Sequence, residues 1–532
     1  MTHSSIRPVA AVGLVAAVLL YVGCTRRDAS PDPAGSPTTT ATESEAKPGG
    51  PTKQLADWWS PQPACIILIS GEQDGYLQPC GCTDGQQGGL GRRYDLLDKL
   101  HAQHWPVASI DLGNLIHNPG SARGGFEQEK VKFGIALKAL ASMKYDAVAL
   151  GPEDLKLGVM ELLGQLLNTK EPRFLAANVK PAEGFEETIR DVSFAEAGPV
   201  KLGITAVLDP AAFAALPDPD KEGLLTLKPP DEVLPAVLDR LTKESQVRIL
   251  LVQGPPEEAK RLGEKFPGFD IVVSTSKFVD PIDTKPTMLN DGKTMLIEVG
   301  KKGKYVGLVG VFPDSTPRFK YHRQALGNRY REAEPMRALI DEEYQSVLRS
   351  VGVVENFPRR PNVEAPTGAS YVGAESCKTC HPNTFSKWAA SKHAHAYEAL
   401  LKNPKRNREF DAECISCHTT GFGFNTGWVS ADATPLLKGN QCENCHGPAS
   451  FHIAEPDNPA YRKPMARTAE SADRNGLCIR CHDEDNDHNF TFGGRYPVIA
   501  HKGLDKYDDP KVHQGVAPAA AKTADAPAQP AR

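Results

Sequence analysis

Cys442-Glu443-Asn444-Cys445-His446 is one of four Cys-x-x-Cys-His motifs in the last third of this 532-residue chain. The others begin at Cys377, Cys414 and Cys478. Two thiols with an adjacent histidine at this spacing form the attachment signature of a c-type haem, because the thiols bond the haem vinyl groups and the imidazole binds the iron. A single Cys-x-x-Cys is also typical of zinc half-sites, redox dithiols and disulfide frameworks, but four copies with an immediate histidine favour haem.

The motifs therefore predict four covalently attached c-type haems. The residues expected to hold them are the attachment cysteines Cys377, Cys380, Cys414, Cys417, Cys442, Cys445, Cys478 and Cys481, and the proximal iron ligands His381, His418, His446 and His482. Because these motifs share residues 377–482, the haems should form much of the local core and lie within electron-transfer contact. We expect only short helices around each motif.

The size and charge of the chain set further limits. A length of 532 residues predicts two or more domains. The formal net charge is −5, and the lysines and arginines are interspersed with acidic residues. No basic stripe indicates nucleic acid as a partner.

The N-terminus predicts export. An apolar run at residues 9–22 suits the core of a signal peptide and is short for a membrane span. It ends in Tyr21-Val22-Gly23-Cys24, which resembles the bacterial lipobox, so we expect lipid on Cys24 and an anchor on the periplasmic side of a membrane. An ordinary secretory signal and an uncleaved anchor are the alternatives, and all three place the body outside the cytoplasm.

Apolar β-branched runs alternate with helical patterns between residues 63 and 319, which predicts a layered α/β domain with buried sheets. The expected strands are 65–70, 107–112, 146–150, 174–179, 201–208, 247–252, 269–274, 294–299 and 305–311. The expected helices include 93–104, 127–143, 158–167 and 230–243. A charged helix at 329–351 and a proline-rich joint then lead to the haem motifs.

These patterns divide the chain into six parts. They are a lipoprotein signal peptide at 1–23, a flexible tether at 24–60, an α/β domain at 61–325, a helix and linker at 326–366, a haem domain at 367–513 and a disordered tail at 514–532. The tether and the tail are rich in small residues and proline without an apolar period, which indicates chain that buries no core.

Three stretches of the haem region carry a family resemblance. They are Trp388-Ala389-Ala390-Ser391-Lys392-His393-Ala394, Thr420-Gly421-Phe422-Gly423, and Cys442-Glu443-Asn444-Cys445-His446-Gly447-Pro448 with His452 after it. On these residues the region resembles the tetrahaem cytochrome c-554 family over about residues 371–501. The resemblance implies a mainly helical and irregular cytochrome c domain that transfers electrons.

The resemblance also implies the distal iron ligands. His393 and His452 match distal ligands of the family, and His501 is expected to be the third. His395 is the alternative to His393, whereas His488 and His513 are expected to be surface histidines. In that family the second haem has no distal protein ligand, so a haem at Cys414, Cys417 and His418 would be five-coordinate and open to a small molecule.

The α/β domain carries a second resemblance. Its segments include Ile110-Asp111-Leu112-Gly113-Asn114, Tyr145-Asp146-Ala147-Val148-Ala149-Leu150-Gly151 and Phe269-Asp270-Ile271-Val272-Val273-Ser274. They resemble the metallophosphoesterase domain of periplasmic 5′-nucleotidases, which implies a four-layer α-β-β-α sandwich.

The residues for two-metal hydrolysis are missing from that domain. Where the family carries Asp-x-His, a bridging Asp and Gly-Asn-His-Glu, this chain carries Ser70-Gly71-Glu72, Asn114 and Gly151-Pro152-Glu153-Asp154. The late histidines are replaced by Gln253 and Thr275-Ser276-Lys277. We therefore expect a degenerate domain with no second metal site. A hard-cation site formed by Glu72, Asp74, Glu153 and Asp154 is the alternative.

The remaining cysteines lie near this region. Two interpretations stay open for Cys80 and Cys82 in Tyr76-Leu77-Gln78-Pro79-Cys80-Gly81-Cys82. They form either a redox-active or metal-binding thiol pair, or a structural bridge or loop without chemistry. Cys65 lies on an apolar strand and is expected to be buried.

These features predict an exported multihaem cytochrome c that passes electrons to redox partner proteins, with the α/β domain as scaffold, docking surface or ligand binder. One alternative is a haem oxidoreductase acting on a small nitrogen or sulfur compound at the open second haem. Another is an active metal-dependent phosphoesterase with a haem appendage. If the chain is an enzyme, we expect an oxidoreductase rather than a hydrolase.

Overall fold

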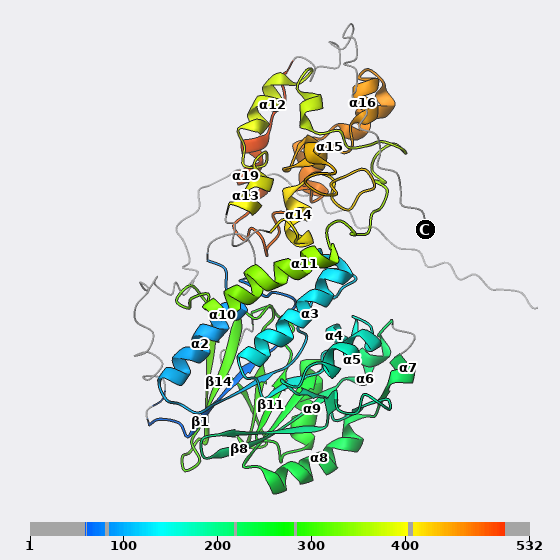
Figure 1. The fold of residues 1–532 in the computed structure, drawn as a ribbon. Coiled ribbons are helices and arrows are strands. Elements are labelled where there is room, and N and C mark those ends of the chain that lie inside the picture. Colours follow the sequence, from blue (N-terminus) through cyan, green and yellow to red (C-terminus); the bar gives the residue numbers. More distant parts are fainter. Residues whose placement is uncertain are drawn as a thin grey trace, which may run out of the picture. The chain divides into compact units, whose positions relative to one another are not determined.

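Residues 65–325 form two β-sheets with helices on their outer faces, and the haem motifs follow (Figure 1). The computed structural model describes residues 59, 61–79, 85–217, 221–280, 285–402 and 408–505, which belong to one compact unit. Among these residues no helix is long and apolar enough to cross a membrane. The expected signal peptide, most of the tether, the tail, and residues Cys24, Cys80, Cys82 and His513 lie outside the described residues.

The first sheet has seven strands in the order β15-β14-β1-β2-β3-β4-β6. Its strands are β1(Cys65–Ser70), β2(Val107–Asp111), β3(Ala147–Ala149), β4(Phe174–Leu175), β6(Ile189–Arg190), β14(Tyr305–Val311) and β15(Phe319–Ala325). Strands β1, β2, β3, β4 and β6 are parallel, whereas β14 and β15 pair antiparallel.

The second sheet has six strands in the order β12-β13-β11-β10-β8-β7, with antiparallel pairs at both edges. Its strands are β7(Val192–Ala197), β8(Val200–Leu208), β10(Val247–Gln253), β11(Ile271–Ser274), β12(Thr287–Leu289) and β13(Thr294–Glu298). A separate pair joins β5(Val179–Pro181) to β9(Leu225–Leu227).

The two faces of β1 show how the layers pack. Cys65, Ile67 and Ile69 lie in the core between the two sheets, together with residues of β8 and β10. Ile66 and Leu68 lie on the opposite face, in the core beneath α2(Leu90–Ala102) and α3(Gly125–Ser142). The helices α8(Pro230–Glu244) and α9(Pro256–Lys265) cover the outer face of the second sheet. This arrangement confirms the predicted four-layer α-β-β-α sandwich and explains why β1 is apolar throughout.

The strands that the sequence did not predict are β6, β7, β9, β12 and β15. Four of them are the sheet edges, and β9 belongs to the small pair. Edge strands are exposed on one side and lack a continuous apolar run, so their sequence signal is weak. The predicted strand at 174–179 is divided into β4 and β5, because Asn178 bonds the backbone of Leu208 and Lys228 instead of continuing the ladder. The smaller helices of the sandwich are α4(Pro152–Leu155), α5(Val159–Leu167), α6(Pro210–Ala214) and α7(Lys221–Leu224).

The helix predicted at 329–351 has a π-helical centre. It consists of α10(Glu334–Arg337), the π-helix η1(Ala338–Tyr344) and α11(Gln345–Val351). It ends where Gly352 adopts a left-handed conformation, with φ of 65°. Figure 1 shows α11 beside α3, and the two helices contact each other.

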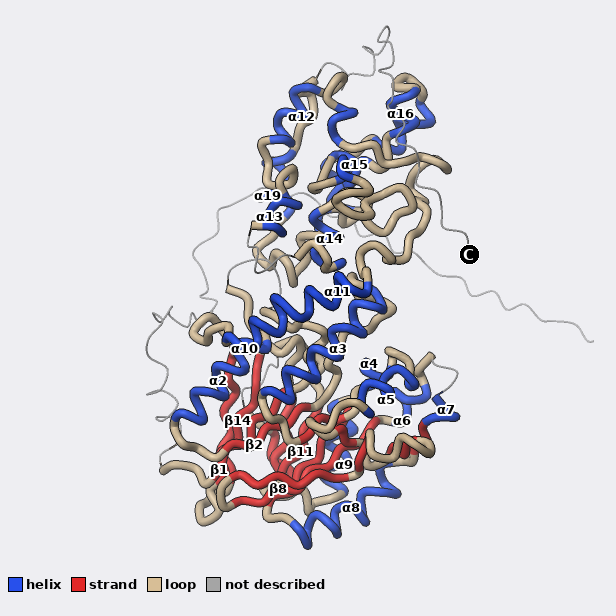
Figure 2. The backbone as a smooth tube through the Cα atoms, in the orientation of Figure 1, coloured by secondary structure: helices blue, strands red, loops and turns tan. Residues whose placement is uncertain are grey.

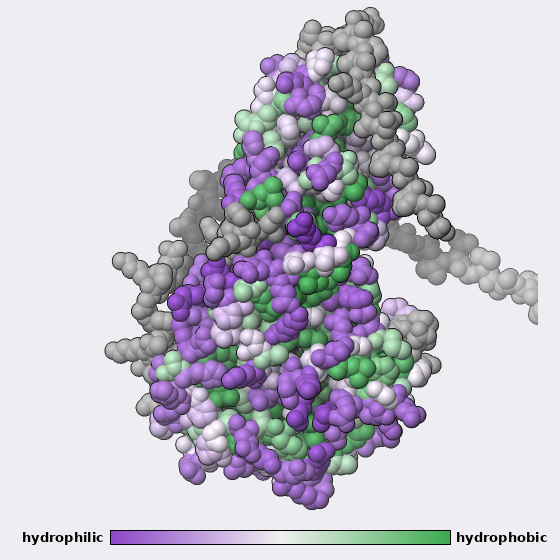
Figure 3. Space-filling view, in the orientation of Figure 1, coloured by the Kyte–Doolittle hydropathy of each residue, from purple (hydrophilic) through white to green (hydrophobic). Residues whose placement is uncertain are grey.

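The haem region consists of short helices joined by loops (Figure 2), as predicted. They are η2(Ala374–Cys377), α12(Pro382–Ala389), α13(Ala396–Leu401), α14(Ala412–His418), η4(Pro435–Leu437), α15(Cys442–His446), α16(Ser450–Ala454), α17(Pro459–Arg462), η5(Lys463–Met465), α18(Ala469–Arg474), η6(Cys478–Arg480) and α19(Phe492–Ile499). Its buried residues Tyr397, Ile415 and Trp428 belong to the same apolar cluster as α2 and α3. The surface in this view is mainly hydrophilic (Figure 3).

We predict that Ile67→Ala lowers the free energy of unfolding by about 2 to 5 kcal/mol, because the truncation leaves a cavity between the two sheets. Urea denaturation of the full-length protein, followed by far-ultraviolet circular dichroism, measures this loss. Val363→Ala is the matched control, since Val363 is 90% exposed and should change stability by less than about 0.5 kcal/mol. Equal losses in the two variants would contradict the packing described for β1.

Candidate haem-binding site

The second and third haem motifs lie on the helices α14 and α15. The first motif begins at the last residue of η2, and the fourth begins with η6. The second motif shows how the sequence builds such a helix. Asp411 caps α14 by accepting hydrogen bonds from the backbone N–H of Glu413 (3.0 Å) and Cys414 (3.4 Å). Residues three and four apart share one side of a helix, so Cys414, Cys417 and His418 can face the same group.

Three proximal histidines are oriented for iron binding. The Nδ1 atom of His418 lies 2.5 Å from the Ala396 carbonyl oxygen, and Nδ1 of His446 lies 2.7 Å from that of Met465. Nδ1 of His482 lies 2.9 Å from a carboxylate oxygen of Asp487. Because these oxygens accept hydrogen bonds, Nδ1 carries the proton and Nε2 keeps its lone pair for a metal.

Two of the expected distal histidines face proximal ones. The ring centres of His393 and His482 are 6.0 Å apart, and those of His446 and His501 are 5.7 Å apart. Metal–imidazole bonds are about 2 Å long, so two imidazoles on opposite sides of one metal have ring centres about 6 Å apart. Both pairs therefore have the separation of two axial ligands.

One imidazole of each pair has a lowered pKa, which favours the neutral form. Burial lowers the pKa of His393, and the nearby His482 lowers it further. Burial likewise lowers the pKa of His446 and outweighs its bond to the Met465 carbonyl. A neutral imidazole is the form that binds metal.

The thiols of different motifs lie next to one another. Cys377 of the first motif is in hydrogen-bond contact with Cys442 of the third, and Cys417 of the second with Cys481 of the fourth. Burial raises the pKa of Cys445 to about 11, with a further contribution from Cys478. In space, the attachment cysteines of the first motif are thus followed by those of the third motif, then the fourth, and then the second.

Buried polar atoms in this region fit a cofactor with polar groups at its rim. Three such atoms have no hydrogen-bond partner among the described residues: Arg359 Nη2, Ser391 Oγ and Trp428 Nε1. A buried polar atom is normally satisfied, so these atoms are expected to meet a group other than protein. The donors, thiols and imidazole pairs together fit c-type haem.

The other histidines have different surroundings. Within the described residues, no imidazole faces His418 as His393 faces His482. His452 lies on α16, whereas His395 and His488 are exposed. His418 of the second motif therefore has no opposing ring in the described part of the chain.

A second cluster of polar side chains lies at the ends of β1, β2 and β10. Asn114 Nδ2 donates to Glu72 Oε1 (2.9 Å), and Gln253 Nε2 donates to the same oxygen (3.2 Å). The backbone φ angles of Glu72, Asp74 and Asn114 are 50°, 51° and 54°, a left-handed conformation that is unusual without glycine. The loops thus have the strained backbone typical of functional sites, but their side chains bond one another.

The four acids of the alternative cation site do not converge. Asp154 Oδ1 and Oδ2 accept bonds from the backbone N–H of Leu115 (2.7 Å) and Asn114 (3.0 Å), and Glu153 pairs with Lys156 (2.8 Å). No group of three or more His, Cys, Asp or Glu side chains that could hold a metal ion occurs in the part of the chain that the structure describes. The alternative of a cation site at Glu72, Asp74, Glu153 and Asp154 is therefore wrong, because these described carboxyl groups bind protein groups instead.

Burial raises the pKa of two of these acids to near or above neutral. Burial, and then the charge of Asp74, raises the pKa of Glu72 to about 8. Burial also raises the pKa of Asp74 to about 7, although Lys301 and Lys302 oppose the shift. Cys65 is buried as expected, which raises its pKa to about 12, and it forms no disulfide with another described cysteine.

Contacts from the haem region close over this end of the sheets. The Tyr76 hydroxyl donates to Asp485 Oδ2 (2.6 Å), and Lys302 pairs with the same carboxylate. Asp485 follows the fourth haem motif by only a few residues. The α/β sandwich and the haem region therefore meet beside the Glu72 cluster.

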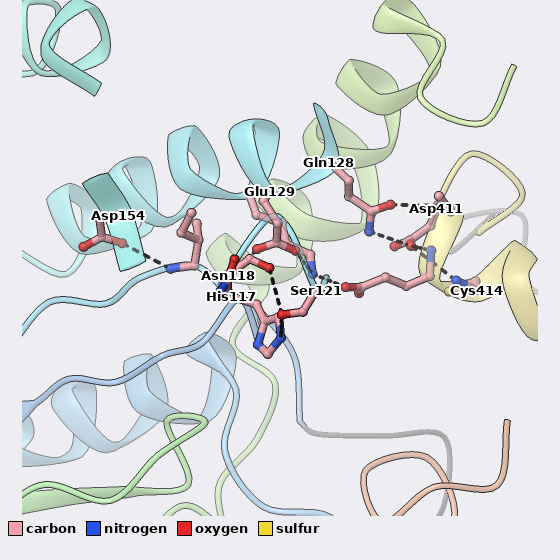
Figure 4. A network of polar contacts seen from close by, with 12 residues as sticks. His117, Asn118, Ser121, Gln128, Glu129, Asp154, Asp411 and Cys414 are labelled. Carbon is pink, nitrogen blue, oxygen red and sulfur yellow. Dashed lines mark hydrogen bonds and ion pairs between the residues drawn. The ribbon is translucent and has the colours of Figure 1, made fainter. Parts of the chain in front are cut away.

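Sequence reasoning missed the side chains that join α3 to the second haem motif (Figure 4). Gln128 bonds Asp411, and Lys132 bonds Glu413. The only signal was a pair of charged residues, Glu129 and Lys132, among the apolar positions of a predicted helix. Charges at such positions are rarely buried unless they are paired.

Comparison with known proteins gives the class of the haem region. Residues 376–447 match the family model described as cytochrome c554 and c-prime. Cytochrome c-554 of Nitrosomonas europaea is 28% identical where it aligns, over 21% of this chain and 58% of that protein. The multiheme cytochrome MtrA of Shewanella baltica is 27% identical, over 20% of this chain and 34% of that protein. This chain thus spans less than two thirds of the length of these relatives.

Solved structures are similar to the other part of the chain. A 5′-nucleotidase precursor from Thermus thermophilus has a TM-score of 0.47 and 17% identity, over 54% of this chain and 59% of that one. The calcineurin-like phosphoesterase YfkN from Bacillus subtilis has a TM-score of 0.43 and 18% identity, over 54% of this chain and 98% of that one. The four-layer fold itself rests on the strand order and the three cores described above.

We predict that Glu72→Gln flattens the pH dependence of stability. The folded pKa of Glu72, about 8, lies above its ordinary value of 4.5, so the folded protein holds a proton that the unfolded chain releases. This contribution is complete below about pH 4.5 and is lost as the pH rises through 8.

The measurement is urea denaturation of both proteins at several pH values between about 5 and 8.5. The wild type should lose about 2 to 4 kcal/mol more than Glu72→Gln over this range. Glu298→Gln is the control, because Glu298 is an exposed acid at the end of β13. Parallel curves for wild type and Glu72→Gln would contradict the buried, protonated state of Glu72.

Proposed function

We propose that this chain is an exported multihaem c-type cytochrome that transfers electrons. Four haems are attached at the four Cys-x-x-Cys-His motifs, with His381, His418, His446 and His482 as proximal ligands. Haem iron at these positions supplies one-electron redox chemistry. The cytochrome c554 match at residues 376–447 supports the class of cofactor and the role in electron transfer.

The facing imidazoles carry this proposal. His393 with His482, and His446 with His501, each combine a motif histidine with a histidine from elsewhere, at the spacing of two axial ligands. We assign His393 to the fourth haem and His501 to the third. His452 is left for the first haem, opposite His381.

The neighbouring thiols support transfer along the array. Contacts between the first and third motifs, and between the second and fourth, bring the attachment points together in pairs. Close attachment points permit direct transfer from one haem to the next. The chain's own residues contribute orientation, since the Nδ1 bonds of His418, His446 and His482 hold each ring.

The second haem is the proposed open position. His418 has no opposing imidazole among the described residues, so its haem would have a free distal side. That free side would admit a small molecule, which keeps an oxidoreductase acting on a small nitrogen or sulfur compound as the second candidate function. The bond from Gln128 to Asp411 supports a place for this haem beside the α/β domain.

Export and anchoring are part of the proposal. Haem attachment to Cys-x-x-Cys-His and the apolar N-terminal run ending at Cys24 support the same location, the periplasmic side of a membrane. A lipid on Cys24 would hold the protein there, close to redox partner proteins. The α/β domain would serve as scaffold or docking surface, because its phosphoesterase ligands are replaced.

The decisive experiment combines a haem count with electron paramagnetic resonance on the full-length protein. We expect four haems per chain, three low-spin with two imidazoles and one high-spin. A spectrum with four low-spin haems would contradict the open second position, and a count below four would contradict the attachment at all four motifs.

We further predict that His393→Ala converts one more haem to the high-spin state while the haem count stays at four, because only the distal ligand of the fourth haem is removed. His395→Ala is the matched control, since His395 is exposed and two residues away. If His395→Ala caused the change instead, the assignment of His393 would be wrong.

A further inference from the structure

Three side chains from one stretch of the α/β domain reach the segment that carries the second haem motif. They are Arg123, at the start of the stretch, and Gln128 and Lys132 on α3. Arg123 also pairs with Asp483 (2.6 Å), directly after the fourth motif. One short stretch of the sandwich therefore contacts the haem region repeatedly, mainly at the segment that carries His418.

Gln128 fixes the start of the haem helix. Its Nε2 donates to Asp411 Oδ1 (2.9 Å), and its Oε1 accepts from the backbone N–H of Ala412 (2.9 Å). Asp411 Oδ1 is the same atom that caps α14 (Figure 4). Gln128 is fully buried, so both ends of its amide are used by the haem segment. The direction of α14 is therefore set from α3.

Lys132 places a buried positive charge beside the same helix. Its Nζ donates to Glu413 Oε1 (2.6 Å) and Glu129 Oε1 (3.0 Å), and the residue is 4% exposed. Glu129 Oε2 in turn accepts from the backbone N–H of His117 (3.0 Å). Burial alone would lower the pKa of Lys132, but the charges of Glu129 and Glu413 reverse the shift and raise it. The ammonium group is therefore charged, next to the residue that precedes Cys414.

We propose that α3 holds the second haem in position. Gln128 positions α14, the helix that carries the second motif, and the charge of Lys132 sets the reduction potential of the second haem. This inference rests on the proposed function, since it requires a haem on Cys414 and Cys417. It gives the sandwich a definite task, which is to hold one haem beside the buried charges of Glu129 and Lys132.

The sign of the effect follows from the charges. Removing Lys132 leaves Glu129 and Glu413 without their cation, and a buried negative charge opposes the arrival of an electron. Removing Glu413 has the opposite effect, because the positive charge of Lys132 then favours the electron. The two single variants should therefore shift the same haem in opposite directions.

The test is a potentiometric titration of the full-length holoprotein and its variants. Lys132→Met should lower the reduction potential of one of the four one-electron steps by at least about 59 mV. This shift corresponds to a tenfold change in the ratio of oxidised to reduced haem. Glu413→Gln should move that step to higher potential, and the other steps should stay in place. Lys138→Met is the matched control on the same helix, because Lys138 is exposed and pairs with the exposed Glu343.

The variants separate the possible failures. Any of three results would overturn the inference. They are an unshifted step in both Lys132→Met and Glu413→Gln, an equal shift of all steps, and the same shift in Lys138→Met. If Lys132→Met fails to fold, the direction of the shift in Glu413→Gln still decides. The haem count of the wild type is measured separately. A count below four would refute the proposed function, whereas unshifted steps in a protein with four haems would refute only this role of α3.

Discussion

An apolar core shared by two parts of the chain underlies most of this structure. Phe133 of α3, Leu348 of α11 and Ile415 of α14 belong to one cluster. Beyond Leu437, the buried apolar residues of the described haem region are only Ala449 and Ala472. A segment with so little buried apolar surface gains little from its own packing, so it depends on the sandwich and on the cofactor that its motifs bind.

Local spacing explains what the sequence could predict. The Cys-x-x-Cys-His motifs are read within five residues, and β1 is recognisable because both its faces are buried. The edge strands gave no comparable signal, since one side of each faces solvent. Asn178 shows another limit: its side chain ends a strand through bonds to residues about thirty and fifty positions away.

The arrangement of the site depends on contacts between distant residues. The bonds from Arg123, Gln128 and Lys132 to the second motif join residues 281 to 294 positions apart, and no local pattern encodes such a pairing. Family resemblance predicts the distal histidines, but it does not predict which proximal histidine each of them faces. Only the folded chain brings His393 opposite His482, past two intervening motifs.

The hydrogen bonds among Glu72, Asn114 and Gln253 have a consequence for how the two sheets are joined. Glu72 and Asn114 follow β1 and β2 of the first sheet, and Gln253 ends β10 of the second sheet. These bonds therefore oppose any sliding of one sheet over the other, because the movement would leave buried amide and carboxyl groups without partners.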